Sequence, residues 1–321
     1  MLGRKKGIGF MRKIHKWIIC AIFIISCTVL MACGSNGSVA VDSQGDQANS
    51  DSAEAEVVVT RPMEITDVSD TEKEIYVYSG ELKLYGKLFL PEGEGPFPVV
   101  VLSSGAGMPF SQYKDIAKKL TDNGIAGVCF DFAGAIDPSR SEGSALECSV
   151  LTEAADLAAV TSSVKELEYI DGDNVFLWGH SLGGFVAAYV GCKYPDMIKG
   201  MLLAEPSFQF HDQIRELFPD ESLIPEISTE PFYCGDIFYK DALGFDIYDM
   251  MPSYKGDVII YAGTKTPSLG AEYKEYLERA EKTFPSAKLV FIDGADHQFV
   301  GDSRKIMIDD MIEYINGQVA H

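Results

Sequence analysis

A serine flanked by glycines is the segment whose residue types point most directly to chemistry. Ser181 lies in Gly179-His180-Ser181-Leu182-Gly183, between an apolar run at 175–178 and a small-residue segment at 185–192. This order predicts a strand, a sharp strained turn and a helix, which together present the serine hydroxyl as a nucleophile. Glycines suit such a turn because any Cβ would collide with the neighbouring strand or helix. The alternative is a glycine-rich turn that only packs a helix on a strand.

A histidine far downstream of this serine is the candidate base. His297 follows the last predicted strand, in Gly-Ala-Asp-His-Gln-Phe at 294–299, where a histidine can reach back across a sheet. The other four histidines lie near the two chain ends, beside the serine, or in a long insertion: His15, His321, His180 and His211. We therefore expect His297 to take the serine proton, a solvated loop histidine being the alternative.

Two backbone N–H groups are candidates for stabilising a developing oxyanion. Leu182 directly follows the serine, and Ala106 lies in the small-residue segment Ser103-Ser104-Gly105-Ala106-Gly107 after another predicted strand. An oxyanion hole is commonly built from these two places, because small residues let substrate approach the main chain. For 103–107, the alternative is an ordinary glycine-rich turn.

The elements that must position these residues form an alternating pattern of short apolar runs and amphipathic segments. This pattern predicts an α/β fold with a mostly parallel, eight-stranded sheet flanked by helices. The first two strands are expected to be antiparallel, and the last six to be buried on both faces. The predicted strands are 75–78, 82–90, 99–102, 127–130, 175–178, 201–203, 258–262 and 289–292.

A segment of about 50 residues, 206–256, separates predicted strands six and seven. It is too long for a simple crossover, so we expect an inserted cap. It is rich in aromatic side chains that would line an apolar pocket or, as we favour, fill the core of the cap itself. These aromatic residues are Phe208, Phe210, Phe218, Phe232, Tyr233, Phe238, Tyr239, Phe245 and Tyr248.

These motifs together resemble those of the α/β-hydrolase superfamily, specifically its serine aminopeptidase-like and feruloyl-esterase-like branch. The resemblance runs from about residue 75 to 315. It rests on the segments 103–107, Phe130-Asp131-Phe132-Ala133-Gly134, Gly179-His180-Ser181-Leu182-Gly183-Gly184, Gly263-Thr264-Lys265 and Gly294-Ala295-Asp296-His297. The resemblance implies a triad hydrolase of carboxylic esters or acyl amides and leaves the substrate open.

The chain departs from these relatives at the triad acid. They usually have Gly-x-Lys-Asp where this chain has Gly263-Thr264-Lys265-Thr266, and His-Gly where it has Ser104-Gly105. In a serine protease, replacing the acid by an amide costs about 10⁴-fold in rate. Three hypotheses remain open: Glu205, after the neighbouring strand, is the acid; Thr266 orients the histidine in a slower dyad; or the protein is a non-catalytic binder.

The N-terminus has the features of a bacterial lipoprotein signal peptide. Six basic residues precede an apolar run at 17–31, which ends in Leu30-Met31-Ala32-Cys33-Gly34. We expect a signal peptide at 1–33 with lipidation of Cys33, a flexible tether at 34–56 and a hydrolase domain at 57–321. An uncleaved signal anchor is the alternative, and both place the domain on the extracytoplasmic face of the cell membrane.

The net charge disfavours a nucleic-acid partner, and the cysteine spacing disfavours a disulfide framework. A net charge of −21 would repel nucleic acid. No metal or nucleotide motif occurs, so no cofactor is predicted. Cysteines 129, 148, 192 and 234 are expected to be unpaired, with a Cys148–Cys234 bridge as the alternative. The sequence thus predicts a membrane-anchored serine hydrolase of small-molecule esters, an amide-cleaving peptidase being the runner-up.

Overall fold

The computed structural model describes residues 61–136, 138–229, 232–266 and 272–319. The predicted signal peptide and tether, including Cys33, lie outside these residues. None of the described helices is both long and apolar enough to span a membrane.

A nine-stranded sheet forms the centre of the described structure, with strand order β1-β2-β3-β5-β4-β6-β7-β10-β11. The strands from β4 onward run parallel to one another, whereas β1, β2 and β3 pair antiparallel. The strands are β1 (Glu64–Asp67), β2 (Glu72–Ser79), β3 (Leu82–Phe89), β4 (Phe97–Ser103), β5 (Ala126–Phe130), β6 (Ile170–His180), β7 (Gly200–Ala204), β10 (Asp257–Gly263) and β11 (Ala287–Ile292).

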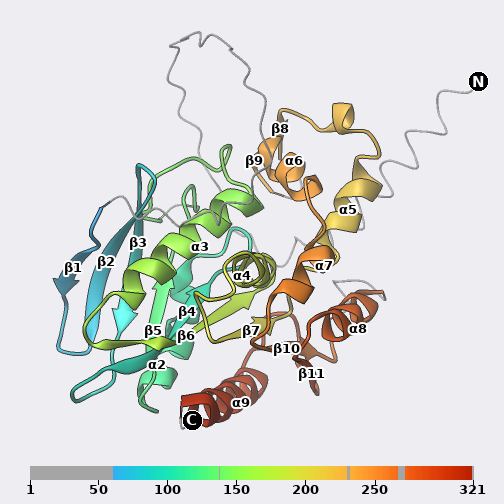
Figure 1. Ribbon diagram of the computed structural model, residues 1–321. Coiled ribbons are helices and arrows are strands. Elements are labelled where there is room, and N and C mark those ends of the chain that lie inside the picture. The colour runs from blue at the N-terminus through green and yellow to red at the C-terminus, as the bar shows by residue number, and fades with distance from the viewer. Residues whose placement is uncertain (1–60, 137, 230–231, 267–271, 320–321) are drawn as a thin grey trace, which may run out of the picture.

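Helices cover both faces of the sheet (Figure 1). Helices α3, α4 and α8 contribute to one apolar cluster, and α2 and α9 to the other. Side chains of β4 alternate between the clusters, with Val99 on one face and Val100 on the other, as the strand pleat requires. The five helices are α2 (Lys114–Thr121), α3 (Val150–Lys165), α4 (Leu182–Lys193), α8 (Tyr273–Thr283) and α9 (Asp302–Val319).

Two details of the sheet differ from the sequence prediction. The ninth strand, β1, was not expected, because its four residues are all exposed and carry no apolar pattern. The prediction that 289–292 is buried on both faces is wrong. Strand β11 pairs only with β10 at the edge of the sheet, and Phe291 is 41% exposed. A short apolar run cannot distinguish an edge strand from a central one.

A long insertion between β7 and β10 contains short elements that extend from the top to the middle of Figure 1, in yellow to orange. The predicted cap range, 206–256, lies between these two strands. Its elements are α5 (Phe210–Leu217), η2 (Glu221–Leu223), β8 (Ile227–Ser228), β9 (Cys234–Gly235), α6 (Ile237–Leu243), α7 (Ile247–Met250) and η3 (Met251–Ser253). Strands β8 and β9 form a small antiparallel sheet of their own.

Candidate active site

Ser181 occupies a sharp turn between strand β6 and helix α4. Its backbone angles, φ 57° and ψ −120°, are strained for a residue with a side chain. The turn requires glycine on both sides: a Cβ on Gly179 would lie 2.3 Å from the Gly183 carbonyl oxygen, and one on Gly183 would lie 2.3 Å from that of Ser104. The observed turn therefore has the geometry that the glycine spacing predicts.

Ser181 is half-buried. Its Oγ lies 3.4 Å from Ser207 Oγ, and within the described ranges it forms no hydrogen bond with His297. Hydrogen bonds of this kind are often long in substrate-free enzymes and tighten when substrate binds. The Ser181 N–H donates to the carbonyl of Ala204 at the end of β7, which fixes the turn against the neighbouring strand.

His297 follows β11 and lies beside the turn that carries Ser181. The ring centroids of His297 and His180, the residue before the serine, are 4.8 Å apart. The His297 carbonyl oxygen is 2.7 Å from Nε2 of His180. Parallel strands end at the same edge of a sheet, so residues that are distant in sequence meet here.

Glu205 directly follows β7, and its carboxylate points to His297. One oxygen, Oε1, accepts a hydrogen bond of 2.5 Å from the Gly263 N–H. The other, Oε2, lies 3.7 Å from Nδ1 of His297. Neither Oε2 nor that Nδ1 has a hydrogen-bond partner within the described structure, and Glu205 is fully buried. A buried carboxylate oxygen without a partner is costly, and the imidazole of His297 is the group that lies near Oε2.

The surroundings of Glu205 hold it in place. Its φ of 49° is unusual for a side-chain-bearing residue, and its N–H donates to the carbonyl of Tyr261 in β10. The buried hydroxyl of Tyr273 donates to the Pro206 carbonyl and lies beside the carboxylate. Burial, and secondarily Glu205, raise the pKa of Tyr273, so this hydroxyl stays protonated and able to donate.

The competing candidates for orienting His297 have other partners. The Thr266 hydroxyl donates to the Gly263 carbonyl at 3.3 Å. Asp296 accepts from the backbone of Gln298, and Asp293 accepts from the Thr264 hydroxyl, so both stabilise turns. The geometry favours Glu205 over Thr266 as the group that orients the histidine.

The two residues expected to supply oxyanion N–H groups lie near the serine. Leu182 is the first residue of α4, where a helix leaves its N–H groups without partners inside the helix. Ala106 follows Gly105, at which an added Cβ would lie 3.2 Å from Ser181 Cβ. The segment after β4 therefore lies against the serine turn, in the region where an oxyanion would form.

A second loop supports the Ala106 segment, and the sequence motif containing Asp131 belongs to it. Asp131 Oδ1 accepts from the Phe110 N–H, and Oδ2 accepts from the Ser139 hydroxyl, both at 2.8 Å. Ile136 of the same loop lies over Gly107, with Cδ1 3.0 Å from the position of an added Cβ. The loop after β5 is therefore tied to the loop after β4.

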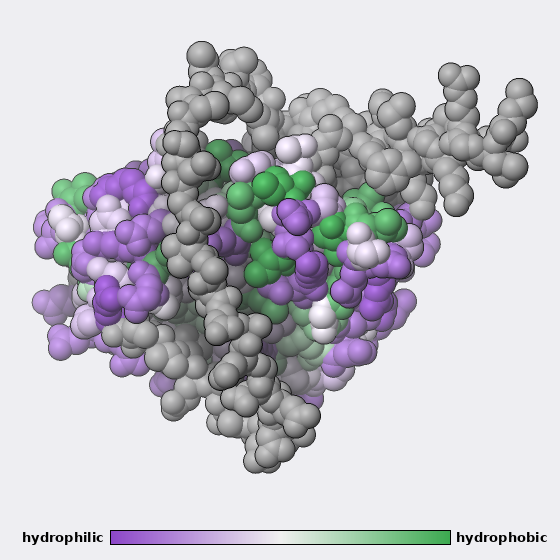
Figure 2. Space-filling model, turned by 90° about the horizontal axis from the view of Figure 1, so that it is seen from above, coloured by the Kyte–Doolittle hydropathy of each residue, from purple (hydrophilic) through white to green (hydrophobic). Residues whose placement is uncertain are grey.

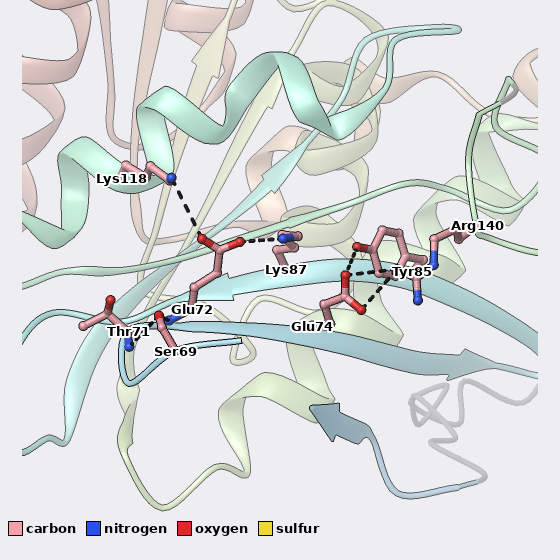
Figure 3. Close-up of polar contacts among 8 residues, drawn as sticks. All are labelled: Ser69, Thr71, Glu72, Glu74, Tyr85, Lys87, Lys118 and Arg140. Carbon is pink, nitrogen blue, oxygen red and sulfur yellow. Dashed lines mark hydrogen bonds and ion pairs between the residues drawn. The ribbon is translucent and has the colours of Figure 1, made fainter. Parts of the chain in front are cut away.

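Arg140 anchors this loop to the antiparallel end of the sheet (Figure 3). Its guanidinium carbon lies 3.9 Å from the ring centroid of Tyr85 in β3, and its Nη1 is 3.0 Å from Glu74 in β2. Tyr85 also donates to Glu74 at 2.7 Å. Beside this group, Glu72 pairs with Lys87 and, at 3.9 Å, with Lys118 of α2. The contacts explain why a largely irregular loop has a defined position.

The aromatic residues of the cap mainly pack on one another. Phe238 contacts the rings of Phe210, Phe232 and Tyr239, with centroids 5.4 to 5.6 Å apart. This arrangement agrees with the expectation that they fill the cap's own core. Exposed apolar side chains remain at Leu223, Ile227 and Tyr233. The view from above, onto the cap side, shows apolar and hydrophilic residues intermixed (Figure 2).

The described residues contain neither a disulfide bond nor a group of side chains arranged to bind a metal ion. Cys129, Cys148, Cys192 and Cys234 are all free thiols, so the alternative of a Cys148–Cys234 bridge is not realised. No group of three or more His, Cys, Asp or Glu side chains in the described residues is arranged to hold a metal ion.

Comparison with known proteins identifies relatives of this chain. Residues 94–229 match a family model described as "Serine aminopeptidase, S33". Esterase EstD of Thermotoga maritima is 31% identical over 114 residues, which cover 32% of this chain and only 26% of that esterase. Human monoglyceride lipase is 24% identical over 222 residues, covering 65% of this chain and 67% of the lipase.

Solved structures share the fold more extensively. Est1E from Butyrivibrio proteoclasticus, with ferulic acid bound, superimposes with a TM-score of 0.68 at 19% identity, covering 77% of this chain and 99% of Est1E. The parallel sheet, its flanking helices and these neighbours define the α/β-hydrolase fold. The fold class predicted from the sequence is confirmed, whereas the catalytic roles of the individual residues stay predictions.

Proposed function

We propose that the protein is a serine hydrolase that cleaves carboxylic esters through an acyl-enzyme, with Ser181 as nucleophile, His297 as base and Glu205 as triad acid. The observation that carries this proposal is the 3.7 Å approach of Glu205 Oε2 to His297 Nδ1 beside the strained Ser181 turn. A catalytic triad requires a carboxylate near one nitrogen of an imidazole whose other nitrogen can reach the serine, and the proximity of Glu205 to His297 beside the Ser181 turn supports this assignment.

The reaction follows from these positions. The Ser181 oxygen attacks the ester carbonyl carbon while its proton passes to Nε2 of His297. The N–H groups of Ala106 and Leu182 stabilise the oxyanion, and Glu205 stabilises the imidazolium. When the tetrahedral intermediate collapses, the bond to the leaving alcohol breaks and His297 gives that alcohol the proton. Water then attacks the acyl carbon while His297 accepts its proton. The bond from that carbon to Ser181 Oγ breaks, His297 returns the proton to Oγ, and the carboxylic acid leaves.

Esters are the favoured substrate class because the relatives named above are an esterase, a monoglyceride lipase and a protein that binds ferulic acid. The matched family model is named for an aminopeptidase, so amide cleavage is the second candidate. A panel of p-nitrophenyl esters and aminoacyl amides distinguishes the two. Faster turnover of the amides would replace the ester proposal.

We expect loss of the Ser181 hydroxyl to abolish both hydrolysis and covalent labelling. The full-length chain, purified in mild detergent, is assayed with short p-nitrophenyl esters and with a fluorophosphonate probe. Ser181→Ala should lower kcat by about 10⁶-fold and prevent labelling, while Ser207→Ala, the matched change 3.4 Å away, should still be labelled. A wild-type protein that the probe does not modify would instead support a non-catalytic binding protein.

A further inference from the structure

His180 is a buried histidine with both ring nitrogens engaged. The residue is the last of β6, directly before Ser181, and is 3% exposed. Its Nε2 lies 2.7 Å from the carbonyl oxygen of His297, and its Nδ1 lies 2.9 Å from the hydroxyl of Tyr113. The sequence placed His180 inside the serine turn but indicated no role for it.

The hydrogen-bond partners determine which nitrogen carries the proton. Burial, and secondarily the His297 ring, lower the pKa of His180 to about 3, so the ring is neutral near pH 7. A carbonyl oxygen can only accept, so the single ring proton must be on Nε2 and directed at His297. Nδ1 then accepts from Tyr113, whose hydroxyl stays protonated because burial raises its pKa.

The same hydrogen-bond chain reaches the segment that carries Ala106. The backbone amide of Gly105 lies against the Tyr113 hydroxyl. A Cβ on Gly105 would lie 3.3 Å from Nδ1 of His180. Trp178 stacks on the His180 ring at 13° between planes, which limits rotation of the imidazole. The His180 side chain thus contacts both the segment after β4 and the loop after β11 that carries His297.

We propose that His180 is a positioning residue that holds the His297 loop in register with Ser181 through the bond from its Nε2–H to the His297 carbonyl. This inference rests on the proposed function, because it concerns the geometry of the same base. His180 acts through the main chain of His297 and does not touch the reacting atoms. Misplacing a catalytic group by about 1 Å can cost about 10²-fold in rate, so the bond is expected to affect turnover more than substrate binding.

Replacing His180 by Gln or by Asn distinguishes the role of its Nε2 from that of its Nδ1. In His180→Gln, the longer side chain keeps an N–H donor near the position of Nε2. In His180→Asn, the shorter one keeps an acceptor near Nδ1 and places nothing near His297. We expect His180→Asn to lower kcat about 10²-fold with KM within about twofold, and His180→Gln to stay within about fivefold of wild type. Equal losses in both variants, or a loss confined to KM, would overturn the proposal.

Combining His180→Asn with His297→Ala tests whether the loss of activity caused by His180→Asn depends on His297. If it does, adding His180→Asn to His297→Ala should not slow fluorophosphonate labelling any further, because the base is already gone. The same fold-loss in both backgrounds would overturn the inference. Should His180→Asn fail to fold, the test passes to Tyr113→Phe, which removes only the hydroxyl that donates to Nδ1 of His180 and holds the ring in place for its bond to the His297 carbonyl. An unchanged kcat in that variant would contradict the proposal.

The outcomes distinguish this inference from the proposed function. Wild-type protein that is not labelled at Ser181 refutes the hydrolase proposal itself. Wild-type protein that is labelled, with His180→Asn labelled equally fast, leaves the hydrolase intact and refutes the role of His180.

Discussion

At the scale of single residues, the candidate site depends on strain that neighbouring groups maintain. Ser181 and Glu205 both have positive φ, and each is held by backbone bonds to an adjacent strand. Such conformations cost about 1–3 kcal/mol each and persist only where the surrounding structure enforces them. Of the three described non-glycine residues with positive φ, two are the proposed nucleophile and the proposed acid, and the third, Phe299, lies two residues after His297.

The hypotheses that Glu205 or Thr266 orients His297 predict opposite rankings of kcat for variants at these two positions. Replacing Glu205 by Gln keeps the side-chain size but removes the charge that stabilises the imidazolium. We expect kcat for p-nitrophenyl ester hydrolysis to fall by about 10²–10⁴-fold, with KM little changed. Thr266→Val serves as the matched control and should stay within about threefold, since the threonine hydroxyl bonds to Gly263. The reverse ranking would identify Thr266 as the orienting group.

At the scale of elements, helix α3 carries buried carboxylates near its start. Its N-cap, Ser149, forms a reciprocal capping box with Thr152. Glu153 and Asp156 are buried in the first two turns, and Asp156 accepts from the Ala133 N–H at 2.8 Å. Asp156 thereby ties the loop after β5 to the helix. Burial, and secondarily Asp156, raise the pKa of Glu153 to about 8; burial raises the pKa of Asp156 to about 6.

These raised pKa values predict that stability falls as pH rises. Between about pH 4.5 and 8 the folded chain holds a proton on Glu153 that the unfolded chain has lost, so the free energy of unfolding decreases across this window. Glu153→Gln should flatten that dependence and raise stability at pH 8 by ~1–3 kcal/mol. Urea unfolding from pH 5 to 8 measures the effect. Glu166→Gln, an exposed change beyond the end of the same helix, should leave the slope unaltered.

At the scale of the whole molecule, one sheet with apolar clusters on both faces supports the site, and the cap is inserted between β7 and β10. The cap packs its aromatic side chains mainly on one another and on α4, where Phe185 contacts Phe210 and Phe245. The strongly acidic chain disfavours attraction to anionic surfaces.

We therefore propose that a lipid on Cys33 attaches the protein to the membrane, and that the surface of the hydrolase fold does not. We expect the wild-type chain, expressed in bacteria, to incorporate an alkyne-labelled fatty acid and to fractionate with membranes. Cys33→Ala should lose the label, whereas Cys27→Ala, a change inside the same apolar segment, should keep it. Labelling that persists without Cys33 would exclude it as the lipidated residue.

The sequence by itself determined the fold class and the serine turn, because both depend on local patterns. Alternating apolar runs predict the sheet, and the spacing of the glycines around Ser181 is a local motif that predicts the turn. The close contact that excludes a side chain at Gly183 is with the distant Ser104 carbonyl, so the motif indicates the turn without showing that contact. The sequence also predicted that His297 lies near Ser181, because residues that follow parallel strands meet at the carboxyl-terminal ends of those strands. The ninth strand and the exposed edge at β11 could not be read from the sequence, since burial depends on which strands become neighbours.

The proximity of Glu205 to His297 and the contacts of His180 depend on tertiary structure alone. The sequence left Glu205, Thr266 and a site without an acid as three open interpretations. The structure brings Glu205 Oε2 to 3.7 Å from the imidazole and gives the Thr266 hydroxyl another acceptor. Side chains separated by about ninety residues meet only because parallel strands end together at one edge of the sheet. The distance between Glu205 and His297 cannot be inferred from a local sequence pattern, because it depends on how the whole sheet is assembled.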